Sequence, residues 1–373
     1  MAPRPASPKY RQVHDALKAQ IERGDVGPGG RLPSEADLGR TFHASRITVA
    51  RAVRDLQLAG LVERRAGAGT FVRARQPAAD RPLVFGMLMP DFGEVEVLSG
   101  ICRGMIEAPD AKAHTLAWAA VGDGADGPEG RAWRACQQHI ARRVDGVFFV
   151  PFEYLPDRHA LNRRMAAALD EAGIPIVLID RSIEPFPHRG QHDVVGLDNR
   201  RAGAVVTDHL LDVGCARPAF VGLPGAASTV DAREYGYREA VQRRQLPAGP
   251  AVLRADPSER GALEALLDRH RPDGIVCASD RTAAFLMRTL LDLGVGVPGD
   301  IRIIGIDDVE YAPLLPVRLS TLRQPCHDIG VAAMAAMVER VANPGLPPRD
   351  ILLHGRLVVR GSTARNAECG VRN

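Results

Sequence analysis

The stretch RLPSEADLGRTFHASRITVARAVRDLQLAGLVERRAGAGTFV (Arg31–Val72) contains two helix starts in close succession and then a hairpin. Ser34 precedes an acidic residue by three positions, a spacing that is typical of a helix N-terminus. Ser45 predicts a second N-terminus, and Gly60 ends the helix that follows, whose apolar residues recur every three or four positions. Two short β-rich runs around a glycine-rich tip then predict a β-hairpin.

The sequence on either side of this stretch completes a small domain. Pro8 begins a helical pattern with apolar residues at four-residue spacing, which ends near Arg23. Three helices and a hairpin within residues 1–75 outline a winged helix-turn-helix. Residues 73–82 contain two prolines and no periodicity, which predicts a linker. We therefore assign residues 1–75 to a first domain and residues 76–82 to the linker.

Beyond the linker, apolar β-rich runs alternate with helical stretches. The predicted strands are 83–89, 114–121, 145–150, 174–180, 193–198, 217–223, 273–279 and 301–307, and the predicted helices are 97–108, 129–142, 157–172, 200–213, 230–245, 258–270 and 280–293. Such alternation is typical of doubly wound parallel sheets. A helix at 327–341 and a strand-like run at 351–359 indicate that the chain returns between two lobes. The fold class is α/β, with a two-lobed domain at 83–363 and a tail at 364–373.

The charge is divided unevenly between these parts. Residues 1–75 hold 14 basic and 7 acidic side chains, a net of +7, whereas the remaining residues hold 34 and 38, a net of −4. A basic domain of this kind gains affinity for nucleic acid by neutralising phosphates. The chain has no apolar run of about 18 residues and no apolar N-terminal core, so we expect a cytoplasmic protein without a membrane partner. The six scattered cysteines form no CxxC pair and predict neither disulfides nor a zinc site.

The motifs RLPSE, SRITVARAV, LAGLVERR and GAGTFV together resemble the GntR-type winged helix of bacterial transcription factors. The resemblance implies that the helix after Ser45 enters the major groove, where Arg46 has the geometry to bond a guanine. The residues that it implies for DNA binding are Ser34, Ser45, Arg46, Thr48, Arg51, Gly67 and Gly69. The family usually has arginine where this chain has Ala50, and whether Arg51 replaces that contact is left open.

The motifs IPIVLIDR, GLDNRRAG, TVDAREYGYREA, DGIVCASDRTA, GVPGDIRIIGIDD and LSTLRQP resemble the LacI/GalR-type ligand-binding domain, which is itself similar to periplasmic sugar-binding proteins. A GntR-like head on such a body resembles the arabinose-repressor type of architecture. The effector-binding residues that the resemblance and the strand ends imply are Phe92, Phe152, Asp180, Arg181, Thr229, Arg233, Ser279, Asp280, Asp307 and Gln324.

These residue types suit a sugar or polyol. Carboxylates accept hydroxyl protons, arginine donates in a fixed fork, and an aromatic ring covers the apolar side of a sugar. Most of the residues follow predicted strands, where open α/β sheets bind their ligands. Glu94 and Glu96 in the first loop of the body meet either the ligand or solvent.

The sequence therefore predicts a ligand-responsive transcriptional regulator, a repressor of a sugar or polyol operon, which binds operator DNA as a homodimer without a cofactor, metal or catalytic residue. One alternative is a winged head fused to an aminotransferase-like body. That chemistry needs a Schiff-base lysine, and Lys112 is the lysine that the sequence offers beyond residue 75. The other alternative is a transport-type sugar-binding protein, which the basic head disfavours.

Overall fold

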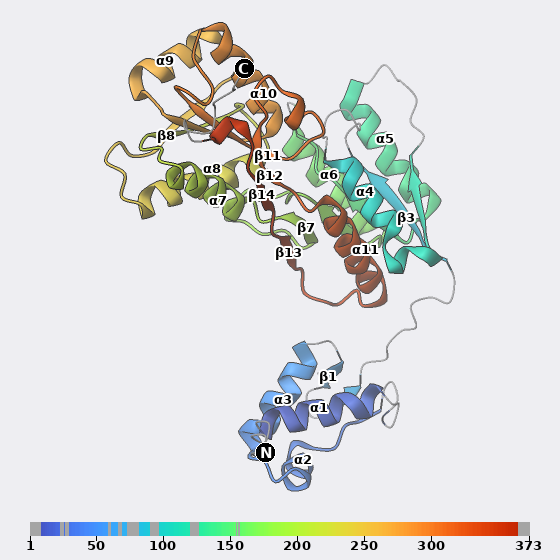
Figure 1. Cartoon of the computed structure of the whole chain (residues 1–373). Helices are drawn as coiled ribbons and strands as arrows, with labels where there is room; N and C mark the ends of the chain where they lie inside the picture. The colour runs from blue at the N-terminus through green and yellow to red at the C-terminus, as the bar shows by residue number, and fades with distance from the viewer. Residues whose placement is uncertain are drawn as a thin grey trace. The chain divides into compact units, whose positions relative to one another are not determined.

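The computed structural model divides into two compact units (Figure 1). One unit comprises Met1–Asp80 with Arg340–Leu346, and the other comprises Arg81–Glu339 with Pro347–Asn373. The described residues are 9–22, 26, 30–58, 61–65, 69–72, 82–89, 97–119, 127–153, 155 and 157–364. We call the described residues up to Val72 the head and those from Pro82 onward the body, and we describe each by itself.

The head contains the predicted helices and hairpin. Its elements are α1 (Lys9–Glu22), α2 (Glu35–Thr41), α3 (Arg46–Leu58), β1 (Val62–Arg65) and β2 (Gly69–Val72). Ser34 caps α2 by accepting a hydrogen bond from the Asp37 amide at 3.2 Å, and Ser45 accepts one from the Thr48 amide at 3.3 Å. The core of the head lies between the three helices and strand β1 and contains Val13, Leu17, Leu38, Val49, Val53, Leu56 and Val62.

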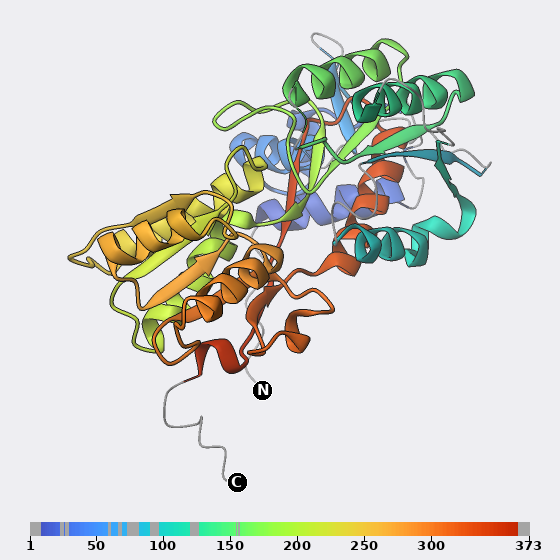
Figure 2. The same ribbon diagram turned by 90° about the horizontal axis from the view of Figure 1, so that it is seen from above.

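The body has two lobes, which Figure 2 shows from above. The first lobe is built on a six-stranded sheet of order β13-β7-β6-β5-β3-β4. Its strands are β3 (Val84–Leu88), β4 (Thr115–Trp118), β5 (Gly146–Phe149), β6 (Ile176–Ile179), β7 (Asp193–Leu197) and β13 (Asp350–Leu353). Its helices are α4 (Leu98–Glu107), the short η1 (Pro109–Ala113), α5 (Gly127–Arg142) and α6 (Arg158–Glu171). All its strand pairs are parallel, as the sequence predicts.

The second lobe has a six-stranded sheet of order β14-β12-β11-β10-β8-β9. Its strands are β8 (Pro218–Gly222), β9 (Ala251–Arg254), β10 (Gly274–Cys277), β11 (Arg302–Asp307), β12 (Ser320–Arg323) and β14 (Arg356–Val358). Its helices are α7 (Asn199–Asp212), α8 (Ser228–Arg243), α9 (Arg260–His270) and α10 (Asp280–Asp292), with short turns η2 (Ala312–Leu314) and η3 (Gly361–Thr363). The pair β12–β14 is antiparallel and the other pairs are parallel.

The chain crosses between the lobes three times, after β7, after β12 and between β13 and β14. The second crossing, at Gln324, leads into α11 (Cys326–Ala342), which packs on the first lobe through Gly104 and Gly146. The expected return between lobes is therefore confirmed.

Two details of the strand prediction were wrong. Residues 351–359 are two strands in different sheets, because the chain crosses between the lobes after Leu353, so that β13 pairs with β7 and β14 pairs with β12. Gly355 lies at this crossing, where a Cβ atom would be 2.0 Å from the Leu322 side chain. The prediction also missed β9 and β12. Ser320 and Thr321 of β12 are polar yet fully buried, so an apolar pattern does not reveal this strand. Among the described residues, no helix is long and apolar enough to cross a membrane.

Helices α7 and α8 approach so closely that glycines stand at both contact points. A Cβ atom on Gly203 would lie 2.0 Å from the Arg233 carbonyl oxygen, and one on Gly236 would lie 1.9 Å from the Arg200 carbonyl oxygen. This contact fixes the face of α8 that carries the Arg233 side chain.

We expect Gly236→Ala to destabilise the body by about 1–3 kcal/mol, because the added methyl group meets backbone that cannot move aside. Gly261→Ala in α9 is the matched control, since its Cβ atom would meet nothing within 4 Å. Urea unfolding measures both variants. Equal midpoints for the two would contradict the close helix contact.

Candidate effector cavity and nucleic-acid interface

A cavity of about 390 Å³ is lined by residues of both lobes. Seven of the ten residues predicted for effector binding line it, namely Asp180, Arg181, Thr229, Arg233, Ser279, Asp307 and Gln324. They come from the loop after β6, from α8, from the N-terminus of α10, from the end of β11 and from the second crossing. The parallel topology brings them together, because these strand ends face the space between the lobes.

In the first lobe, Arg181 lies between two carboxylates. Its Nη2 is 2.8 Å from Asp180 Oδ2, and its Nη1 is 2.6 Å from Glu153 Oε1. The three side chains are at most 10% exposed. Glu153 Oε2 is buried and has no hydrogen-bond partner among the described residues, so it is an acceptor available to a ligand hydroxyl group.

Sequence reasoning missed Glu153, although it follows β5 by four positions and its neighbour Phe152 was selected. The signal that would have found it is a carboxylate just beyond the end of a buried strand. Phe152 instead packs in the core, 6.4 Å from Phe149 between ring centroids, and its backbone bonds the Asn162 side chain. This ring therefore does not line the effector cavity, whereas Phe285 of α10 does.

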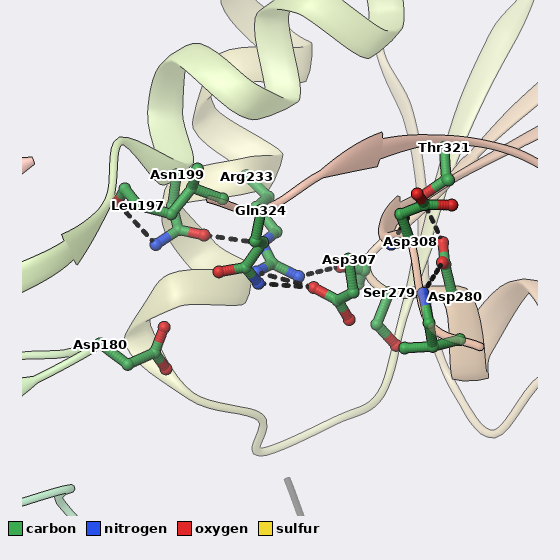
Figure 3. Close-up of polar contacts among 12 residues, drawn as sticks. Asp180, Leu197, Asn199, Arg233, Ser279, Asp280, Asp307, Asp308, Thr321 and Gln324 are labelled. Atoms are coloured by element: carbon green, nitrogen blue, oxygen red, sulfur yellow. Dashed lines mark hydrogen bonds and ion pairs between the residues drawn. The ribbon is translucent and has the colours of Figure 1, made fainter. Parts of the chain in front are cut away.

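In the second lobe, Arg233 is the centre of a buried network (Figure 3). It donates from Nε to Asn199 Oδ1 at 2.8 Å and from Nη1 to the Ala278 carbonyl at 2.5 Å. Its Nη2 lies 3.5 Å from Asp307 Oδ1, which also accepts a 2.6 Å hydrogen bond from Gln324 Nε2. Gln324 Oε1 is buried without a partner in the described part of the chain. The network thus presents a second available acceptor.

The backbone is strained where the carboxylates stand. Asp180 has φ 70°, Asp307 has φ 133° and Asp308 has φ 59°, values that residues other than glycine rarely adopt. Gly196 makes room for the first of these turns, because a Cβ atom there would lie 3.0 Å from the Asp180 backbone. Strain of this kind concentrates at ligand sites, where the surrounding structure holds it.

Asp280 lies beside the cavity rather than in its lining. Its carboxylate is fully buried and accepts hydrogen bonds from Thr321 Oγ1 at 2.6 Å and from the Val309 amide at 3.1 Å (Figure 3). Burial, followed by the charge of Asp307, raises the pKa of Asp280 from 3.8 to about 7. The folded protein therefore holds this proton over a pH range in which the unfolded chain has lost it.

Because the folded pKa is raised, Asp280 contributes stability that is fully present below pH 3.8 and is lost as the pH rises through about 7. We expect Asp280→Asn to remove this loss of stability with rising pH, because an amide does not titrate. The amide keeps the shape of the carboxyl group, and it can accept a hydrogen bond from the Val309 amide and donate one to Thr321 Oγ1. The free energy of unfolding, measured at pH 5 and pH 8, should increase for the variant relative to the wild type as the pH rises. A difference that is constant with pH would contradict the raised pKa.

On the head, the structure exposes the start of α3. The Arg46 side chain is 89% exposed and the neighbouring Ile47 is 83% exposed. Sequence reasoning did not select Ile47, although an exposed apolar side chain at this position suits a thymine methyl group. Ser45 and Thr48 bond each other at 2.8 Å beside these residues.

The wing is completed by the segment before α2. The Leu32 amide bonds the Thr70 carbonyl at 2.8 Å, and the Arg31 side chain occupies the space beside Gly69, whose φ is 118°. Ser34, Arg46 and Gly69 line one hollow. Arg51 instead packs on the Tyr10 ring of α1, with 4.5 Å between its guanidinium carbon and the ring centroid. Gly67, Phe92, Glu94 and Glu96 lie outside the described residues.

Comparisons with known proteins agree with both resemblances. Residues 9–72 match the gntR family of bacterial regulatory proteins, and residues 207–363 match a periplasmic binding protein-like domain. The chain is 26% identical over 367 residues to the arabinose metabolism transcriptional repressor of Geobacillus stearothermophilus, which covers 95% of this chain and 98% of that protein. It is 29% identical over 244 residues to the ribose operon repressor of Escherichia coli K12, covering 64% and 70%.

Solved structures share the fold. A LacI family transcriptional regulator from Enterococcus faecium with bound ribose superposes with a TM-score of 0.59 at 23% identity, covering 76% of this chain and 99% of that chain. The complex of the transcriptional regulator CelR with cellobiose gives a TM-score of 0.62 at 22% identity, covering 96% and 100%. The two-lobed architecture predicted from the sequence is thereby confirmed.

Proposed function

The chain joins a GntR-type winged helix-turn-helix to a periplasmic-binding-protein-like effector domain, and from this premise we propose that it is a repressor of a sugar-utilisation operon. The main support for this proposal is the cavity, which brings charged and amide side chains of both lobes together. The repressor binds operator DNA through the head as a homodimer in the cytoplasm. It performs no catalysis and needs no cofactor or metal.

We assign the cavity to a free monosaccharide or polyol. Its volume of about 390 Å³ is at the small end of the range of about 300–1,000 Å³ for ligand sites, which favours one sugar ring over a longer chain. Arg181 and Arg233 are each paired with carboxylates, so the buried groups around the ligand are close to charge balance. The named functions of the relatives make arabinose and ribose the first sugars to test.

The effector acts by bridging the lobes. Glu153 belongs to the first lobe, Arg233 belongs to the second, and Gln324 lies at a crossing between them. A ligand that bonds all three favours one arrangement of the lobes, and it shifts the DNA-binding equilibrium only through this difference in affinity. We further propose residues 1–75 as the DNA-binding domain, 76–82 as the linker and 83–363 as the effector domain.

A thermal-shift screen tests the ligand assignment. We expect one free sugar from a panel of pentoses, hexoses, polyols and disaccharides to raise the melting temperature of the full chain by several degrees. A ligand at about 100 times its Kd adds roughly 2.7 kcal/mol of stability. Stabilisation by pyridoxal phosphate and by no sugar would overturn the assignment in favour of an aminotransferase-like body.

A further inference from the structure

One half-buried carboxylate joins three elements of the head. Glu35 is the first residue of α2, and its side chain is 18% exposed. Its Oε1 bonds Nη2 of Arg64 on β1, and its Oε2 lies 3.8 Å from Nε of Arg46, the first residue of α3. The start of the recognition helix and the wing strand are therefore linked through a single side chain.

The two arginines that Glu35 links remain open to solvent. The Arg64 side chain is 57% exposed and the Arg46 side chain is 89% exposed, and both line the same hollow. Arg51 does not line this hollow, and its guanidinium stacks on the Tyr10 ring. Of the four described arginines that line the hollow, Arg46 and Arg64 are the two that pair with Glu35, and Arg64 comes from the wing strand.

We propose that Arg64, positioned by Glu35, is the second DNA-reading arginine and binds the acceptor edge of a guanine in the operator. This inference rests on the proposed function and names a specificity residue for it. The geometry favours a base over a phosphate, because a carboxylate beside the guanidinium repels phosphate oxygens. A G·C pair instead offers guanine acceptors beside a cytosine amino donor, which tolerates a neighbouring carboxylate.

Glu35 acts here as a positioning residue. Ion pairs with exposed arginines contribute little to folding, so the carboxylate has a small role in stability and a larger one in fixing where Arg64 points. Removing its charge also makes the surface more basic. Glu35→Gln should therefore weaken sequence-specific binding while leaving non-specific binding equal or stronger, which a merely structural role would not produce.

The test uses the full chain and two duplexes: one that the wild type selects from a random-sequence pool, and a scrambled duplex of the same composition. We expect Arg64→Ala and Arg64→Lys to lower the affinity for the selected duplex about tenfold and to lower the ratio of the two affinities, because lysine lacks the bidentate fork. Arg54→Ala, an exposed residue farther along α3, is the control and should leave the ratio unchanged. Circular dichroism confirms that each variant is folded.

Three results would overturn the inference. If Arg64→Ala weakens binding to both duplexes equally, and lowers the slope of log affinity against log salt concentration by about one, then Arg64 contacts a phosphate. A ratio that falls in Arg51→Ala and not in Arg64→Ala would return the role to the helix. A wild-type chain that selects no duplex at all would overturn the proposed function, and this inference with it.

Discussion

Replacing Arg233 with alanine is expected to abolish the response to effector while leaving DNA binding intact. The guanidinium is buried and is hydrogen-bonded or paired with Asn199, Ala278 and Asp307 at once. Its loss leaves the Asp307 carboxylate with one charge partner fewer. Breaking a buried ion pair in this way destabilises the fold by about 3–5 kcal/mol. We expect the affinity for the effector to fall at least a hundredfold, as measured by calorimetry with the sugar found in the thermal-shift screen.

Two further variants separate this effect from a loss of folding. Arg238→Ala changes the same residue type on the same helix, where the side chain is 43% exposed and pairs with Glu234, so it should bind effector normally. Asp307→Asn retains the shape of the network and should still impair the effector response. An Arg233→Ala protein that dissociates from DNA with wild-type sensitivity to the sugar would refute the assignment of the cavity.

Replacing Arg46 with alanine is expected to weaken specific DNA binding by about 10-fold to 100-fold, which corresponds to about 1–3 kcal/mol for a bidentate guanine contact. The side chain is the first of α3 and is 89% exposed, so its removal leaves the core of the head unchanged. Effector binding by the body should be unaffected. A gel-shift titration with the selected duplex measures the change.

Arg54→Ala on the same helix is the matched control for Arg46→Ala. Arg54 is exposed but lies two turns farther along α3, away from the N-terminal residues that reach base edges. It should alter binding to any duplex by a small and equal factor. Wild-type operator affinity in Arg46→Ala would remove this residue from the reading surface.

The elements of the head were predictable because their signals are local. The two helix caps follow from Ser34 and Ser45, and the buried face of α3 follows from the spacing of Val49 and Val53. None of these signals depends on residues far away in the sequence. The same holds for most strands of the body, whose apolar runs are buried on both faces. The division of residues 351–359 between two sheets was not predictable, since it depends on pairing with β7 and β12, which lie far away in the sequence.

The residues that line the cavity were predictable where they follow strands. They were less predictable where packing decides the direction in which a side chain points. Asp180, Asp307 and Gln324 stand at strand ends, and topology alone brings them together. Phe152 and Asp280 also follow strands, but their side chains are taken up by core packing and by hydrogen bonds to Thr321 and Val309. The link from Glu35 to Arg64 joins residues 29 positions apart, which no local pattern contains.

In the proposed mechanism, a small polar ligand in the body controls DNA binding by the head. Fluorescence anisotropy of the full chain on its selected duplex, with and without the stabilising sugar, measures this control. We expect the sugar to change the DNA affinity of the wild type at least tenfold and that of Arg233→Ala not at all. An affinity that the sugar leaves unchanged in the wild type, although the sugar binds, would contradict this mechanism.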